Sequence, residues 1–135
     1  MPETPPSTDD RRPLGAAAVV GLIAVGAFVG AVLRYGVGLG LPGPAGTLAV
    51  NVAGSLLLGL LLEWAIGRDF LSRAVRLGLG SGLLSSFTTY SAFALDVSRL
   101  APGLAAGYVL ATYGLGFLAV LLGRALGRSL EGGPA

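Results

Sequence analysis

The side chains best suited to chemistry in this sequence are the hydroxyls of one short segment, SSFTTYSAF, at residues 85–93. Six of its first seven residues carry a hydroxyl: Ser85, Ser86, Thr88, Thr89, Tyr90 and Ser91. A hydroxyl in a membrane helix often donates to the carbonyl one turn earlier, but this density exceeds that need. With Gly78, Gly80 and Gly82 just before it, the cluster predicts a helix that breaks in mid-membrane.

A helix break inside a membrane has a chemical consequence. Non-helical backbone at that depth is tolerated only where it is buried in protein or lines a cavity. Its freed carbonyls and amides can then bind ions. We therefore expect an ion site near the bilayer centre, with Phe87, Tyr90 and Phe93 around it.

Three polar residues at four-residue spacing form a slanted stripe on the preceding apolar segment: Thr47, Asn51 and Ser55. The Asn51 amide offers two donors and one acceptor about one turn inside the membrane. Such a polar group is either functional or an interhelical hydrogen bond that only holds the bundle together. Both interpretations of Asn51 stay open on the sequence alone.

Further polar groups lie on the first and last apolar segments. Tyr108 and Thr112 are four residues apart on one helix face, and they either extend a polar track or are ordinary packing. Arg34 ends the first apolar segment. It either snorkels to the interface or gathers anions at a pore entrance.

The composition excludes several classes of function. The chain contains no Cys and no His, so it has no disulfide and no thiolate metal site, and the most common general base is missing. We do not expect an enzyme. The net charge of +2 is small and scattered, which argues against a nucleic-acid partner. With 53% hydrophobic and 12% charged residues, the chain has about half the charged fraction of a soluble domain.

Four long uncharged intervals define the architecture. Each is long enough for the ~20 residues that a membrane-spanning helix needs. They predict an all-α membrane protein with spans at about 14–39, 47–66, 73–98 and 104–126. Residues 14–126 form one four-helix domain, and the polar, Pro-rich residues 1–13 and the tail 127–135 are expected to be disordered.

The arginines predict an orientation. With four spans, one side carries seven of them and the other carries Arg34 and Arg99. The seven are Arg11, Arg12, Arg68, Arg73, Arg76, Arg124 and Arg128. The positive-inside rule then places both termini in the cytoplasm.

Pairs of glycines four residues apart predict close helix contacts, since small residues let membrane helices approach. Such pairs occur at 26/30, 78/82, 103/107 and 123/127. Four short helices can barely enclose a pathway alone, so a dimer is expected.

Three segments together resemble the signatures of the Fluc (CrcB-like) fluoride channels. They are GAFVGAVLRY, GTLAVNVAGSLLLG and GLLSSFTTYSAFALD, in the order in which the family carries its motifs. The resemblance extends over about residues 14–126. It implies a fluoride-specific channel of a prokaryotic cell membrane, built as an antiparallel dimer with two pores and a structural sodium ion.

The resemblance also implies roles for particular residues. Backbone carbonyls of Ser85 and Thr88 would hold the sodium ion. Asn51 would be the pore asparagine, Tyr90 and Phe93 would replace the two pore phenylalanines, and Arg34 would match the arginine of the first helix. Polar positions along the fluoride path would be Thr89, Ser91, Tyr108 and Thr112. Three positions depart from the family pattern: Ser85-Ser86 replaces Gly-Gly, Tyr90 replaces Phe, and Asp96 replaces Glu.

Neutral groups suit the transfer of fluoride. Hydroxyls, an amide and aromatic edges can replace the hydration shell of a small anion without trapping it. No titratable group lines the path expected from the sequence, which favours passive conduction out of the cytoplasm over proton coupling.

The uneven arginine count predicts one orientation and therefore a partner of opposite orientation, a paralogue, with a homodimer as the alternative.

Three other interpretations of the function remain. A small multidrug-type proton antiporter needs a carboxylate in the first span, and none is present there. The chain could instead be a non-conducting or accessory subunit of a heteromeric fluoride channel, or a structural membrane protein whose hydroxyls only join helices.

Overall fold

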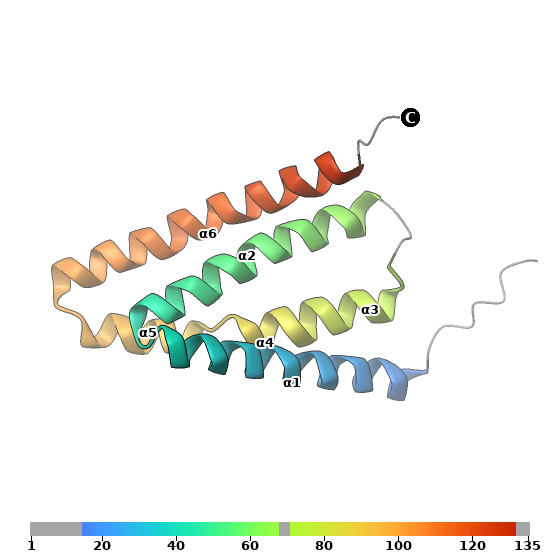
Figure 1. Ribbon diagram of the computed structural model, residues 1–135, viewed down its shortest axis with the longest axis horizontal. Coiled ribbons are helices and arrows are strands. Elements are labelled where there is room, and N and C mark those ends of the chain that lie inside the picture. Colours follow the sequence, from blue (N-terminus) through green and yellow to red (C-terminus); the bar gives the residue numbers. More distant parts are fainter. Residues whose placement is uncertain (1–14, 68–70, 132–135) are drawn as a thin grey trace, which may run out of the picture.

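A computed structural model describes residues 15–67 and 71–131, and all regular structure in these ranges is helical (Figure 1). The long helices are α1 (Ala16–Gly40), α2 (Pro44–Gly67) and α6 (Pro102–Glu131). The third segment consists of α3 (Arg73–Leu77), a π-helical stretch η1 (Gly78–Leu84), α4 (Ser85–Phe87) and α5 (Tyr90–Arg99). The expected disordered segment 1–13 lies outside the described residues.

The long helices confirm three of the expected spans as continuous helices. Stretches long and apolar enough to cross a membrane are Ala16–Gly40, Pro44–Trp64 and Pro102–Leu130. The fourth span, expected at 73–98, is present but bent, because its helix ends at Phe87 and begins again at Tyr90. The predicted break in the third helix is therefore confirmed.

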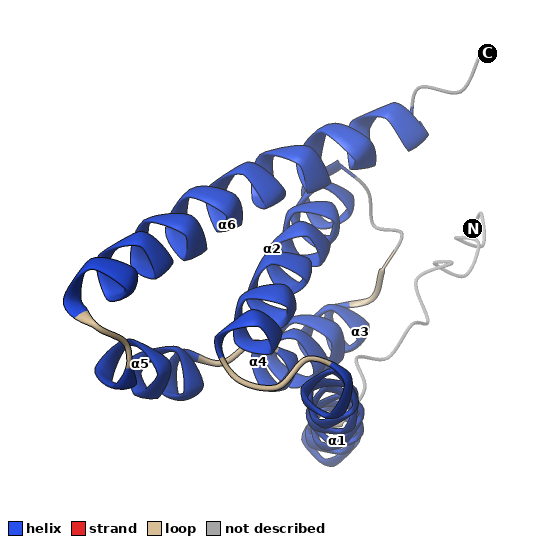
Figure 2. Ribbon diagram, turned by 60° about the vertical axis from the view of Figure 1, so that its left-hand side comes forward, coloured by secondary structure: helices blue, strands red, loops and turns tan. Residues whose placement is uncertain are grey.

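The helices associate in two pairs. α1 packs mainly against η1 and α4, while α2 packs mainly against α6. Figures 1 and 2 show α1 beside the third segment and α2 beside α6, with α5 at the end of the bundle where α6 begins. The cavity described below lies in the space between the two pairs.

Glycines make both pairings possible. A Cβ on Gly26 or Gly30 would collide with the backbone of the third segment, at Gly78 and Leu83 respectively. A Cβ on Gly123 would likewise collide with the Leu56 carbonyl of α2. These contacts are backbone against backbone, as expected where dispersion and not hydrophobic burial holds helices together.

The Gly103/Gly107 pair does not behave as expected. A Cβ at either position would have no neighbour within 4 Å in the described part of the chain. Both glycines lie in the first turns of α6, where no other helix of this chain approaches closely enough to require them. The contact predicted there is wrong within a single chain.

One acidic side chain joins the ends of α2 and α6. Glu63 pairs with the Nε atoms of Arg124 at 2.9 Å and Arg128 at 3.2 Å, and its side chain is only 15% exposed. Gly127 leaves room for the Glu63 stem. This link explains why α6 continues to Glu131, beyond residue 126, where the sequence indicated that the helical domain ends.

Candidate functional site

The helix break consists of two extended residues. Thr88 has φ −76° and ψ 159°, and Thr89 has φ −150° and ψ 120°. Thr89 Oγ1 accepts the Ala92 N–H at 3.2 Å, so Thr89 caps the start of α5 as a threonine commonly does. Thr88 Oγ1 donates to the Leu84 carbonyl at 2.9 Å, one turn back.

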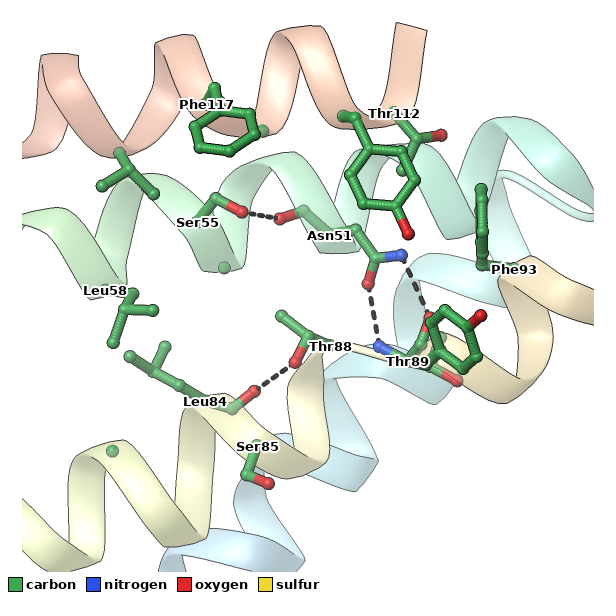
Figure 3. Close-up of a pocket in the computed structure, with 16 residues that line it drawn as sticks. Asn51, Ser55, Leu58, Leu84, Ser85, Thr88, Thr89, Phe93, Thr112 and Phe117 are labelled. Atoms are coloured by element: carbon green, nitrogen blue, oxygen red, sulfur yellow. Dashed lines mark hydrogen bonds between the residues drawn. The ribbon is translucent and has the colours of Figure 1, made fainter. Parts of the chain in front are cut away.

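The side-chain amide of Asn51, on α2, both accepts a hydrogen bond from the backbone of the break and donates one to it (Figure 3). Its Oδ1 accepts the Thr89 N–H at 2.8 Å, and its Nδ2 donates to the Thr89 carbonyl at 3.0 Å. The Thr89 N–H requires an acceptor, which fixes which end of the amide is oxygen. Only one of the two Nδ2 hydrogens is used, so one donor remains for another acceptor.

α2 approaches the break through Gly54. A Cβ there would collide with Thr88 Cγ2 and lie near the Phe87 ring. Gly54 follows Asn51 by three residues, so both lie on the face of α2 that meets the third segment. The sequence interpretation did not include Gly54, although this helical spacing from Asn51 could have identified it.

A cavity of about 560 Å³ opens between the two helix pairs. It contains seven of the residues expected at the ion site: Asn51, Ser85, Thr88, Thr89, Tyr90, Phe93 and Thr112. No Asp, Glu, Lys or Arg is among the described residues that line it. The cavity is therefore a mostly apolar space with a few uncharged polar groups, which is the usual composition of a small-ligand site.

The cavity wall on α6 was only partly predicted. Besides Thr112 and the adjacent Tyr113, it includes Gly116, Phe117 and Val120. Gly116 and Val120 lie one and two turns beyond Thr112, and Phe117 lies one turn beyond Tyr113. Extending the expected polar track along α6 by that spacing would have identified them.

Phe93 is the centre of an aromatic cluster beside the cavity. Its ring centroid is 5.8 Å from that of Tyr90, 5.5 Å from that of Tyr108 and 5.9 Å, edge to face, from that of Tyr113. Phe93 is only 7% exposed, whereas Tyr90 is 74% exposed. Phe93 is thus held in place by its own chain, while Tyr90 projects from the open side.

The remaining hydroxyls differ in their partners. Thr112 Oγ1 is buried and has no hydrogen-bond partner in the described part of the chain. Ser91 Oγ lies 3.2 Å from Thr89 Oγ1. Tyr108 does not line the large cavity; its hydroxyl donates to Asp96 Oδ2 at 3.5 Å.

A second, smaller pocket lies on the other side of the break. Its volume is about 300 Å³, and Arg34, Thr47, Thr89 and Asp96 are among its lining residues. Arg34 Nη1 donates to the Thr88 carbonyl at 3.5 Å. Arg34 is therefore directed towards the broken backbone, and Thr89 separates the two pockets.

The fold and the two pockets define the class: a small multi-pass membrane protein whose broken helix presents uncharged polar groups to a cavity that is open on one side. A sequence model described as "CrcB-like protein, Camphor Resistance (CrcB)" matches residues 21–124. The chain belongs to this CrcB-like family.

Curated relatives agree with this assignment. The fluoride-specific ion channel FluC 2 of Halobacterium salinarum is 52% identical over 112 residues, 82% of this chain and 88% of the relative. FluC 1 of Haloarcula marismortui is 43% identical over 124 residues, 92% of this chain and 97% of the relative. FluC of Agrobacterium fabrum is 46% identical over 121 residues, 82% and 97% of the two chains.

Proposed function

We propose that this protein is a fluoride-specific ion channel that conducts fluoride passively out of the cytoplasm, and is not an enzyme. The observation that carries the proposal is the cavity at the helix break, which is lined by neutral donors and aromatic rings and by no charged side chain among the described residues. The relatives named above carry the same function in their names.

Fluoride must exchange its hydration shell for protein donors as it enters the cavity. The spare N–H of Asn51 Nδ2 and the unpartnered hydroxyl of Thr112 are such donors. The positive ring edges of Phe93 and Tyr90 supply further partial charge. Thr89 adds a hydroxyl at the cavity wall, with the Ser91 hydroxyl 3.2 Å from it. Because these groups are dipoles and not ions, they stabilise the anion without holding it permanently.

The smaller pocket is the proposed mouth of this path. Arg34 there attracts anions, while Asp96, hydrogen-bonded to Tyr108, limits how much net positive charge the mouth carries. Thr89 borders both pockets, so the mouth leads to the break and to Asn51.

The break also suits a structural sodium ion. The Ser85 and Thr88 carbonyls are near the end of α4, where carbonyls lose their helical partners, and the Thr88 carbonyl also accepts from Arg34 Nη1 at 3.5 Å. Neutral oxygens are suitable ligands for a hard cation. The described residues contain no cluster of three acidic, His or Cys side chains for a metal, so backbone carbonyls would be the ligands. A bound sodium ion would supply fixed positive charge at these carbonyls.

The open side of the cavity supports an antiparallel dimer with two pores. The side chains of Tyr90, Ser85 and Ser91 are exposed in the single chain. A second subunit inserted in the membrane in the opposite direction would cover them. The arginine count favours a paralogue of opposite orientation, with a homodimer as the alternative. We place both termini in the cytoplasm of a prokaryotic cell.

Efflux from liposomes, followed with a fluoride electrode, tests the function. We compare this chain alone, its paralogue alone, and both together. Fluoride release that needs no proton gradient and does not extend to chloride is expected from the mixture. If no arm releases fluoride, the channel proposal fails. Release by the paralogue alone, unchanged by adding this chain, would show that this chain is not a conducting subunit.

A further inference from the structure

The position of the helix break depends on an exchange of hydrogen-bond partners. In an uninterrupted helix the Thr89 N–H would donate to the Ser85 carbonyl, four residues earlier. Here it donates to Asn51 Oδ1 at 2.8 Å, while the preceding amide, that of Thr88, still follows the helical pattern and donates to the Leu84 carbonyl at 3.0 Å. The helical ladder therefore ends at the amide that Asn51 binds.

The same exchange frees a backbone oxygen. Among the described residues, no backbone amide donates to the Ser85 carbonyl across the break. Asn51 also donates to the Thr89 carbonyl at 3.0 Å, so it binds both backbone polar groups of the residue at which the helical ladder ends. A half-buried peptide group without partners would be strongly destabilising.

We propose that Asn51 is a positioning residue for the helix break: its carboxamide substitutes for the Ser85 carbonyl at the Thr89 amide, holds Thr88 and Thr89 extended, and so leaves the Ser85 carbonyl open to a cation. This role rests on the proposed function only for the identity of the cation. It adds to the anion contact expected for Asn51, since that contact uses the remaining Nδ2 hydrogen.

Hydrogen exchange at the Thr89 amide tests this role directly. The full-length chain, reconstituted in lipid nanodiscs, is compared with Asn51→Ala and Asn51→Asp by mass spectrometry of peptides covering residues 85–92. Asn51→Ala removes both bonds, and we expect exchange of Thr89 to accelerate at least tenfold, the size expected for losing about one such hydrogen bond. Asn51→Asp keeps an acceptor but no donor, so the exchange rate of the Thr89 amide in this variant should lie between those of the parent and of Asn51→Ala.

A matched control separates local positioning from general damage. Ser55→Ala removes a hydroxyl one turn further along α2 that donates only to the Asn51 carbonyl of its own helix, at 2.8 Å. It should leave Thr89 exchange within threefold of the parent. In the Asn51 variants, peptides from α6 should be unchanged while 85–92 accelerates.

The result that overturns the proposal is Thr89 exchange within threefold of the parent in every Asn51 variant that folds, since Asn51 would then act only on the anion. If Asn51→Ala does not fold, Asn51→Asp decides by the same criterion. Hydrogen exchange is measured without fluoride, so it does not depend on conduction. If the parent chain conducts no fluoride, the channel proposal fails, but the exchange data still test the role of Asn51 in the helix break.

Discussion

The side-chain hydroxyls in this protein differ in their hydrogen-bond partners, and this difference indicates which of them are available to contact an ion. Thr47, Ser55 and Thr88 each donate to the carbonyl four residues earlier in the chain, which is the ordinary behaviour of such side chains. Thr89 is used as a helix cap. Thr112 alone among the buried side-chain polar atoms described has no partner, and a buried hydroxyl without a partner destabilises the fold unless a ligand satisfies it.

A valine at position 112 should therefore improve stability and impair function. Thr112→Val keeps the shape and removes the unpaired hydroxyl, so we expect the free energy of unfolding to rise by about 1 kcal/mol. Fluoride efflux should fall, since the cavity loses a donor. Equilibrium unfolding in mixed detergent and liposome efflux measure the two effects.

Thr47→Val is the control for this experiment. The Thr47 hydroxyl is buried and donates to the Gly43 carbonyl at 3.4 Å, so its removal should lower stability by roughly 0.5–1.5 kcal/mol. A Thr112 variant with unchanged efflux would show that this hydroxyl takes no part in conduction.

At the level of helices, the contact between α1 and the third segment depends on the absence of side chains. A Cβ on Gly30 would meet the Leu83 carbonyl and the Phe87 amide, neither of which can move aside. Gly36 is on the same helix, but a Cβ there would have nothing within 4 Å. The two glycines thus offer a test of packing within one element.

The two alanine substitutions should change stability in opposite directions. Gly30→Ala should lower the free energy of unfolding by about 1–3 kcal/mol, because overpacking forces the backbones apart. Gly36→Ala should raise it by up to ~1 kcal/mol, the ordinary gain from replacing glycine within a helix. Equal effects in unfolding experiments would mean that α1 does not pack against the third segment through Gly30.

Much of this arrangement could be predicted from the sequence. The uncharged intervals locate the spans, and the hydroxyl cluster places a break in the third. The position of that break could not be derived locally, because it is fixed by Asn51 and Gly54 on another helix. The π-helical turn and the extension of α6 past residue 126 likewise depend on contacts between helices.

At the scale of the whole molecule, the two ends of the bundle differ in charge. Arg73, Arg76, Arg124 and Arg128 lie on helices at the end where α2 and α6 finish, and Arg34 and Arg99 are towards the other end (Figure 1). Arg11, Arg12 and Arg68 lie outside the described residues. This asymmetry is the basis for proposing one orientation in the membrane.

Cysteine labelling measures that orientation. The chain has no native Cys, so within this chain only the introduced cysteine can be labelled. Ala101→Cys, between α5 and α6, and Ser129→Cys, near the end of α6, are both at exposed positions. In intact cells an impermeant maleimide should label the first and not the second. Labelling of each in about half of the molecules would instead support two orientations and a homodimer.

The interruption of the third segment has a consequence for how the protein is made. The helical run before it, residues 73–87, and the run after it, residues 90–99, are each shorter than the ~20 residues that cross a bilayer. Neither piece can leave the translocon and enter lipid alone, since the unpaired peptide groups between them would face hydrocarbon. The ribosome delivers α1 and α2 first, and these supply the glycine surface and the asparagine that the third segment needs. Synthesis order and assembly are thereby coupled.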